Sequence, residues 1–291
     1  MSSILNILNQ VSFGRHYLQI ALLLRESLLI NSMLNNVEVW HGITRDEEKE
    51  FQKVDLILLR KLLGAPISTP KESFFLELGI LPISILLKAK RVRYLHYPLN
   101  KNKAEMLSRF FWAQWRRPCK GDWVNLIKQD LAELGIPDDL EKITAYSKLS
   151  FKKYVKDRSK EVAFQSLMSC KENHSKMSWI NYSELGMQDI YSSSELSIDE
   201  ARVIFLFRVH MCQFTQNFRG TNVYDLCLLC RNHPDTQESM SECKELKRQF
   251  AYMNIGKMIK DVYSGKVGTE TVRDLKLILS FREEKKKMME V

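Results

Sequence analysis

The chain lacks a long hydrophobic run. Its most apolar stretch, Ile20–Leu24, is five residues long, whereas a membrane-spanning helix needs about 20. The first residues, MSSILNILNQVSFGRHY, have neither the basic segment nor the apolar core of a secretory signal peptide. We therefore expect an intracellular protein in a reducing compartment, cytoplasmic or nuclear, with no membrane partner.

The motifs of several large enzyme classes are also missing. The sequence contains no P-loop, no GxSxG and no HExxH. Metal-dependent nucleotidyl or phosphoryl transfer needs carboxylates that converge on two cations. The adjacent aspartates Asp138 and Asp139 follow a proline and are better placed to cap a helix than to bind metal. We therefore expect no enzyme activity from the chain as it stands.

Strand-like alternation of polar and apolar residues is scarce, and helical periodicity dominates. Capping boxes at Thr44–Glu47 and Ser197–Glu200 predict two helix starts, because the hydroxyl and the acid three residues later satisfy free backbone N–H groups. Thr69 before Pro70 predicts a third start, with the threonine as the cap. The sequence thus predicts a mainly α fold.

Two places interrupt the helical pattern and suggest boundaries. One is Gly135–Pro137, and the other is the mixed, serine-containing stretch 175–194, which we interpret as a linker. A chain of 291 residues is long enough for about two domains. We expect a helical domain at 1–135, polar helices and a linker at 136–195, and a C-terminal helical segment at 196–291.

Positive charge is concentrated in one stretch, residues 81–120. It contains ten cations and one acid, Glu105, and so carries the same formal net charge as the whole chain, +9. Aromatic residues lie between these cations. Cations can follow a phosphate backbone, and flat rings can stack on unpaired bases. The candidate nucleic-acid-binding residues are Lys88, Lys90, Arg91, Arg93, Lys101, Lys103, Arg109, Trp112, Trp115, Arg116 and Arg117.

A second interpretation of this stretch is a solvated basic face whose rings point into the core. Charge runs in soluble proteins often have that role. Clustering this tight is, however, typical of a nucleic-acid site. Both interpretations stay open from the sequence.

Three of the six cysteines lie close together near the C-terminal end. Cys227 and Cys230 have the two-residue gap that lets both thiolates bind one metal, and Cys243 follows thirteen residues later. His233 is the one histidine near them. Three sulfurs and one imidazole would form a closed, structural zinc site. The alternative is that all three are ordinary free thiols.

Six phrases of the sequence, in order, resemble the C-terminal part of a LINE-type non-LTR retrotransposon polyprotein. The resemblance covers about residues 14–250. The phrases are LLLRESLLINSMLNNVEVW (22–40), LLRKLLGAPISTPKESFFLELGILPI (58–83), KAKRVRYLHYPLN (88–100), AQW with KGDW (113–123), DEARVIFLFRVHMCQFTQNFRG (199–220) and CLLCRNHPDTQESMSEC (227–243).

In that family, this region follows the reverse-transcriptase palm. The resemblance therefore implies a helical, thumb-like bundle and then a small helical domain with a CCHC zinc knuckle at 227–243. The paired aspartates of the family's palm lie upstream of the matching part, so polymerase activity is not implied. What is implied is a segment that grips RNA or an RNA–DNA duplex, through the basic helix Lys88–Arg93 and its surroundings.

The knuckle departs from the family pattern at one position. The family's histidine falls in a phrase similar to DTxEH, and here Ser239 stands in its place. A serine hydroxyl is a poor zinc ligand, so the site is one ligand short unless His233 replaces it.

Three alternative functions are therefore expected. The first is non-catalytic nucleic-acid binding, the second a helical scaffold that binds protein, and the third an accessory part of a polymerase whose palm is on another chain. A thumb without its palm would expose parts of Tyr17–Leu28 and Phe74–Leu81, which predicts self-association.

Overall fold

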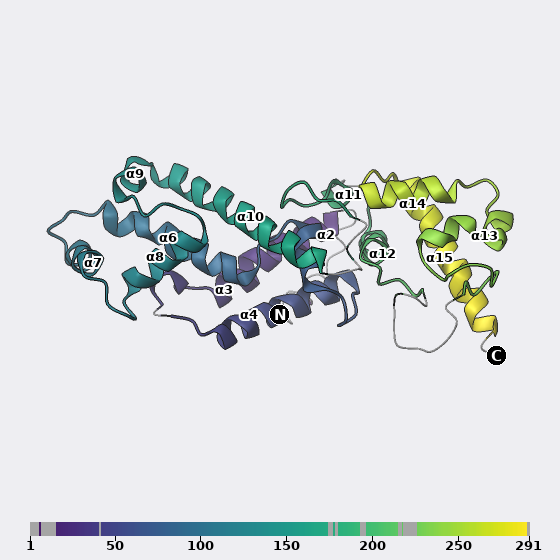
Figure 1. The fold of residues 1–291 in the computed structure, drawn as a ribbon, viewed down its shortest axis with the longest axis horizontal. Helices are drawn as coiled ribbons and strands as arrows, with labels where there is room; N and C mark the ends of the chain where they lie inside the picture. Colours follow the sequence, from purple (N-terminus) through teal and green to yellow (C-terminus); the bar gives the residue numbers. More distant parts are fainter. Residues whose placement is uncertain are drawn as a thin grey trace. The chain divides into compact units, whose positions relative to one another are not determined.

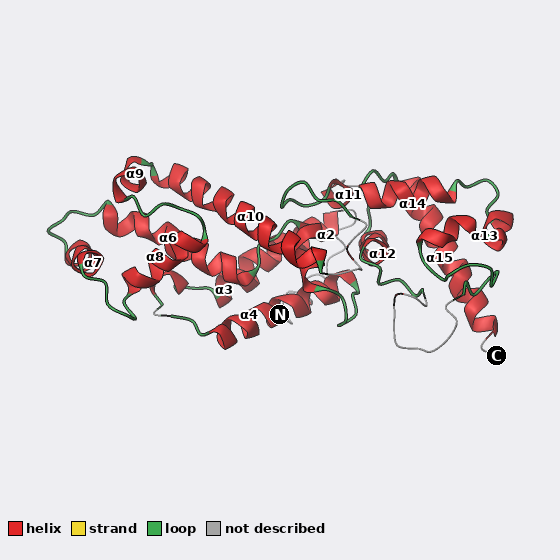
Figure 2. Cartoon of the chain, in the orientation of Figure 1, coloured by secondary structure: helices red, strands yellow, loops and turns green. Residues whose placement is uncertain are grey.

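The computed structural model describes residues 6, 16–40, 42–173, 177, 180–192, 196–214, 217 and 226–289. These residues are mainly helical, as the sequence predicted (Figure 2). The described part contains no strand, and its β-type pairing is limited to the isolated bridges Leu78–Met187 and Leu226–Pro234. None of the described helices is both long and apolar enough to cross a membrane.

The chain divides into two compact units. Unit 1 comprises Met1–Leu24, Leu58–Gly79 and Cys170–Val291, and unit 2 comprises Arg25–Ile57 and Ile80–Ser169. Segments from distant parts of the sequence therefore share a unit. These units do not coincide with the segments expected from the sequence, 1–135, 136–195 and 196–291. The functional roles of those segments stay predictions.

Unit 2 is built around α6, which packs on α8 and on the short helix η3. Buried Val92 and Leu95 on α6 and Val124 and Ile127 on α8 contribute to its core. Its helices are η2 (Arg25–Ile30), α3 (Asn31–Met33), η3 (Val37–Val39), the first part of α4 (Arg45–Leu63), α6 (Ile83–Leu99), α7 (Met106–Arg116), α8 (Trp123–Glu133), α9 (Leu140–Ala145) and most of α10 (Lys148–Glu172) (Figure 1).

Unit 1 has its main core among α12, α13, α14 and α15. Phe207, Leu246, Val262, Leu275 and Ile278 are fully buried there. Its helices are α2 (Tyr17–Leu24), the end of α4, α5 (Lys71–Leu78), α11 (Asp189–Ser192), α12 (Ile198–Arg208), η6 (Glu238–Glu242), α13 (Lys244–Gln249), α14 (Ile255–Ser264) and α15 (Thr269–Met289).

Two of the three predicted helix starts are confirmed. At α4, Thr44 N–H donates to Glu47 Oε2 at 2.8 Å and Glu47 N–H donates to Thr44 Oγ1 at 3.3 Å. At α12, Ser197 and Glu200 form the same reciprocal box. The third start was wrong by one position, because α5 begins at Lys71 with Pro70 as its cap, and the buried Thr69 hydroxyl has no hydrogen-bond partner in the described part.

The stretch predicted as a linker is partly a packed segment of unit 1. Ile180, Tyr182, Ile190 and Tyr191 are buried, and Met187 pairs with Leu78 at the end of α5. At that end Gly79 has φ +63°, and a Cβ there would lie 2.0 Å from the backbone N of Met187. Only glycine fits this position.

The apolar surface expected on an isolated thumb is largely covered. Residues Glu72–Leu78 of α5 are all buried, and so are Leu18 and Ala21 of α2. Of the apolar side chains in Tyr17–Leu28, Leu23 and Leu28 are exposed. The prediction of self-association therefore rests on a smaller surface than expected.

Both units contain buried arginine–carboxylate pairs, which the sequence did not reveal. In each pair, both side chains are at most 7% exposed. Arginine suits such places because its planar group donates to both oxygens of a carboxylate. The pairs are Arg25–Asp55 and Arg91–Asp130 in unit 2, and Arg208–Glu77 and Arg282–Asp235 in unit 1.

Candidate functional site

The basic helix α6 does not present its cations as one solvent-facing row. Arg91 is buried and donates two hydrogen bonds to Asp130, from Nε at 2.6 Å and from Nη2 at 2.8 Å. Burial raises the pKa of the Asp130 carboxyl, while the bonds from Arg91 lower it. The pair is therefore part of the core between α6 and α8. The prediction that Arg91 contacts a nucleic-acid backbone does not fit this position.

Two neighbouring lysines of α6 also have intramolecular partners. Lys88 is paired with Glu133, and Lys90 Nζ donates to the backbone oxygen of Leu34 at 3.2 Å. Burial lowers the pKa of Lys90. Burial likewise lowers the pKa of Arg93. Three of the four cations in the predicted grip, Lys88, Lys90 and Arg91, thus have partners within unit 2.

The candidate cations that remain exposed lie around α7. Lys103, Arg109, Arg116 and Arg117 are exposed, and so is Lys120. None of these five forms an ion pair with any described residue. We call them, with the exposed ring of Phe110, the α7 surface.

The aromatic residues of α7 divide between the core and the surface. Phe111 is buried and contacts Trp112 and Trp115, with ring centroids 5.4 and 5.5 Å apart. Both tryptophans are half-buried, and Lys128 Nζ lies 4.5 Å from the ring centroid of Trp115. The predicted stacking residues therefore take part in packing within unit 2. Phe110, which was not among the candidate site residues, is 62% exposed.

The three clustered cysteines come together in unit 1 as their spacing predicted. Their sulfur atoms all lie within 4.8 Å of one another, and Cys227 Sγ is 3.7 Å from Cys243 Sγ. Tetrahedral Zn–S bonds of about 2.3 Å place neighbouring sulfurs about 3.8 Å apart. The cluster can therefore bind a metal ion with little movement of the chain.

The loop around these cysteines is held by its own backbone. Cys227 N–H donates to the His233 oxygen at 2.7 Å, and Arg231 N–H donates to the Cys227 oxygen at 2.8 Å. Arg231 has φ +51°, which closes the tight turn after Cys230. On α15, Arg282 Nη2 donates to Asp235 at 2.6 Å, and its Nη1 lies 3.9 Å from Cys227 Sγ. Arg282 therefore fixes the loop to a long helix.

Two side chains near the three cysteines compete for the role of a fourth ligand. His233 Nε2 lies 3.2 Å from Cys230 Sγ, but its nitrogen is outside the group of three mutually close sulfurs. The Ser239 hydroxyl donates to the Pro234 oxygen at 2.5 Å and so is occupied by the loop backbone. His233 is therefore the better placed of the two to complete a tetrahedral site.

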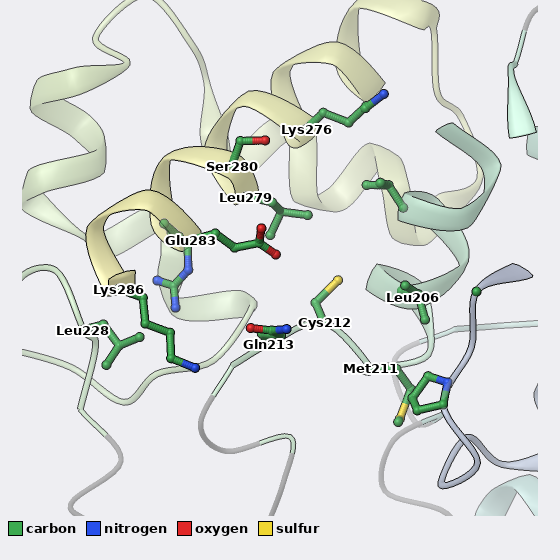
Figure 3. A pocket seen from close by; sticks show the side chains of 14 residues that line it. Leu206, Met211, Cys212, Gln213, Leu228, Lys276, Leu279, Ser280, Glu283 and Lys286 are labelled. Carbon is green, nitrogen blue, oxygen red and sulfur yellow. The ribbon is translucent and has the colours of Figure 1, made fainter. Parts of the chain in front are cut away.

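A pocket of about 490 Å³ lies beside this loop in unit 1 (Figure 3). Lys276, Ser280 and Glu283 of α15 line one side, and Leu206 and Met211 lie opposite. Cys212 also lines the pocket, and burial raises the pKa of its thiol to about 12. A thiol held neutral in this way is a poor nucleophile.

Asp139 has the structural role predicted for it. Its carboxylate caps α9 by accepting from Lys142 N–H at 3.1 Å. That hydrogen bond lowers the pKa of Asp139, so the side chain acts as a charged cap.

Comparisons with known proteins do not identify the chain. No family model matches it, and neither a curated protein nor a solved structure does.

Proposed function

We propose that this chain is a non-catalytic nucleic-acid-binding protein that holds RNA or an RNA–DNA duplex on its α7 surface. The resemblance to the thumb region of a non-LTR reverse transcriptase favours the same function. The observation that carries the proposal is the group of exposed cations around α7, which form no ion pair with a described residue, in contrast with the paired cations of α6.

The spacing along α7 supports binding to a phosphate backbone. Arg109 and Arg116 are seven residues apart, close to two turns, so they lie on one face about 10 Å apart along the axis. The exposed ring of Phe110 follows Arg109 directly in the helix. From 106 to 121 the sequence has four cations and no acid. Such a surface favours phosphates without selecting a base sequence.

The test is RNA and duplex binding as salt is varied, with Arg109, Arg116, Arg117 and Lys120 all changed to Gln. Removing one cation that binds a phosphate should flatten the plot of log K against log salt by roughly 0.7–0.9. Removing all four should weaken binding by roughly 10²- to 10³-fold near 0.1 M salt. Because these residues are exposed and outside the core, the variant should unfold at the same urea concentration as the parent.

A matched control removes the same charge elsewhere. Lys247, Lys257, Lys260 and Lys266 are exposed residues of unit 1, and changing all four to Gln should leave most of the affinity and slope. Equal weakening in both variants would show that net charge alone attracts the nucleic acid. An unchanged slope in the α7 variant would overturn the proposal.

A protein-binding scaffold is the second candidate. Met106 and Phe110 of α7 are 74% and 62% exposed, an apolar surface that suits a protein partner. Such binding would survive high salt and would be weakened more by Phe110→Ala than by removal of the arginines. If the partner is a palm-bearing polymerase chain, mixing the two should restore primer extension that neither shows alone.

We further propose that Cys227, Cys230, Cys243 and His233 hold a structural zinc ion. Its binding would stabilise a loop whose own core is small.

Titration with Co²⁺ should give the intense visible absorption of a tetrahedral thiolate site at one ion per chain. Added Zn²⁺ should displace the Co²⁺ and remove this absorption. Cys243→Ser should abolish that spectrum, His233→Ala should weaken binding, and Cys170→Ser, at an exposed cysteine outside the cluster, should change nothing. Octahedral, weakly absorbing Co²⁺ would contradict the assignment.

A further inference from the structure

Unit 2 contains a second basic site, a pocket of about 700 Å³ that shares no lining residue with the α7 surface. It is lined by one face of α6, by η3 and by the start of α10. Its volume falls within the range of small-ligand pockets, roughly 300–1,000 Å³. Three of the cations predicted from the sequence line it, namely Lys90, Arg93 and Lys101.

The charge of the pocket is positive. Besides those three cations, Lys148 and Lys152 of α10 line it, and Glu38 is the acid among its lining residues. Outside the lining, Glu105 pairs with Lys101 at 3.4 Å, and the charge of Glu26 acts on Lys90 and Arg93. Five cations therefore face three carboxylates, and positive charge remains in excess. This excess of positive charge favours the entry of an anion with several oxygens.

Arg93 lines the pocket, and one of its donors is unsatisfied. Its Nε atom is buried and has no hydrogen-bond partner among the described residues. An unsatisfied buried donor is unfavourable, because it has given up its hydrogen bonds to water without gaining others. An oxygen acceptor that reached Nε would remove that penalty. Lys90, by contrast, already donates to the Leu34 oxygen.

Aromatic rings form another part of the lining. Tyr94 and Tyr97 lie one turn apart on α6, with ring centroids 5.5 Å apart. Tyr97 is 47% exposed, and Lys101 Nζ lies 5.0 Å from its ring centroid. Trp123 packs edge-on against Tyr94 and donates from Nε1 to the backbone oxygen of Glu38 at 2.7 Å, which fixes the η3 side. An exposed, supported tyrosine ring can stack on a planar heterocycle.

We propose that this pocket binds a nucleoside phosphate, with the phosphates among Arg93, Lys148 and Lys152 and the base against Tyr97. The ligand can be a free nucleotide or the phosphorylated end of a strand, because both present the same chemistry. The proposal does not depend on the α7 surface, since the two sets of residues are separate.

The test is calorimetric titration of the full chain with ADP, adenosine and pyrophosphate. ADP should bind most tightly, because only ADP offers both the ring and the phosphates. Changing Lys148 and Lys152 to Gln should lower the affinity for ADP at least about tenfold, as expected for the loss of two charge-assisted hydrogen bonds. Both lysines are exposed, so the fold should be kept. Tyr97→Ala should weaken the binding of ADP but leave the affinity for pyrophosphate unchanged.

Two further measurements separate the outcomes. A short oligonucleotide with a 5′-phosphate, compared with its 5′-hydroxyl form, distinguishes a strand end from a free nucleotide. The α7 variant at Arg109, Arg116, Arg117 and Lys120 should bind ADP as the parent does, even if it no longer binds RNA. Pyrophosphate binding as tightly as ADP, no binding of ADP at millimolar concentration, or full ADP binding by the Lys148/Lys152 variant would each overturn the proposal.

Discussion

Replacing Arg208 by methionine is expected to lower the free energy of unfolding of unit 1 by about 3–5 kcal/mol. Arg208 is 1% exposed and Glu77 is fully buried, and Arg208 Nε donates to Glu77 Oε2 at 2.9 Å. Arg208 Nη1 also donates to the backbone oxygens of Val262 and Tyr263 at 2.6 and 3.0 Å. Removing the arginine would leave a buried carboxylate and two carbonyls without this donor.

The expected decrease can be measured by urea unfolding followed by circular dichroism. Arg273→Met, at an exposed position of α15, is the control and should change stability little. Changing Glu77 to Gln together with Arg208 to Met should recover part of the stability, because no charge is then left buried. Tyr182 OH donates to Glu77 Oε1 at 2.5 Å and can still donate to an amide oxygen. A single Arg208→Met variant as stable as the parent would disprove the role of this pair.

Arg91→Met is expected to cost a similar amount, about 3–5 kcal/mol, in unit 2. The partner Asp130 is 2% exposed and accepts both bonds of Arg91. The substitution therefore leaves an uncompensated buried carboxylate between α6 and α8. Lys88→Gln should cost less, because its partner Glu133 is 57% exposed and water can replace the lysine.

Binding experiments on the basic stretch should leave Arg91 in place, because its loss destabilises unit 2. A variant with Lys88, Lys90, Arg91 and Arg93 all changed to Ala should fail to bind nucleic acid because unit 2 unfolds. The check is its unfolding curve beside that of Arg91→Leu with Asp130→Leu, in which an apolar pair replaces the ions. That double variant should be more stable than Arg91→Met. If the double variant is as unstable as Arg91→Met, the loss of side-chain packing, rather than a buried unpaired charge, would explain the instability.

Most local features of the fold were predictable because they depend on nearby residues, although the cap of α5 is Pro70 and not Thr69. Both capping boxes follow from short-range backbone hydrogen bonding. The meeting of Cys227, Cys230 and Cys243 was predicted for a similar reason, since the two-residue gap fixes the first pair. The fourth ligand was not predictable, because it depends on the loop conformation.

The role of Arg91 could not be read from charge clustering, because its partner lies 39 residues further along the chain. One signal was present in the sequence. Leu87, Arg91 and Leu95 recur every four residues, so Arg91 lies on the apolar face of its helix. The same holds for Glu77 among the apolar residues of α5. A charge on an apolar stripe indicates a buried partner elsewhere.

Because Cys119 is exposed, a fluorescent probe can be attached beside the α7 surface. Cys119 is exposed and lies between Arg117 and Lys120, whereas Cys212, Cys227 and Cys243 are buried. With Cys170 changed to serine and the proposed metal site filled, a maleimide dye would attach chiefly at Cys119. The natural sequence thus carries its own attachment point for a fluorophore, placed where a bound strand would alter its emission.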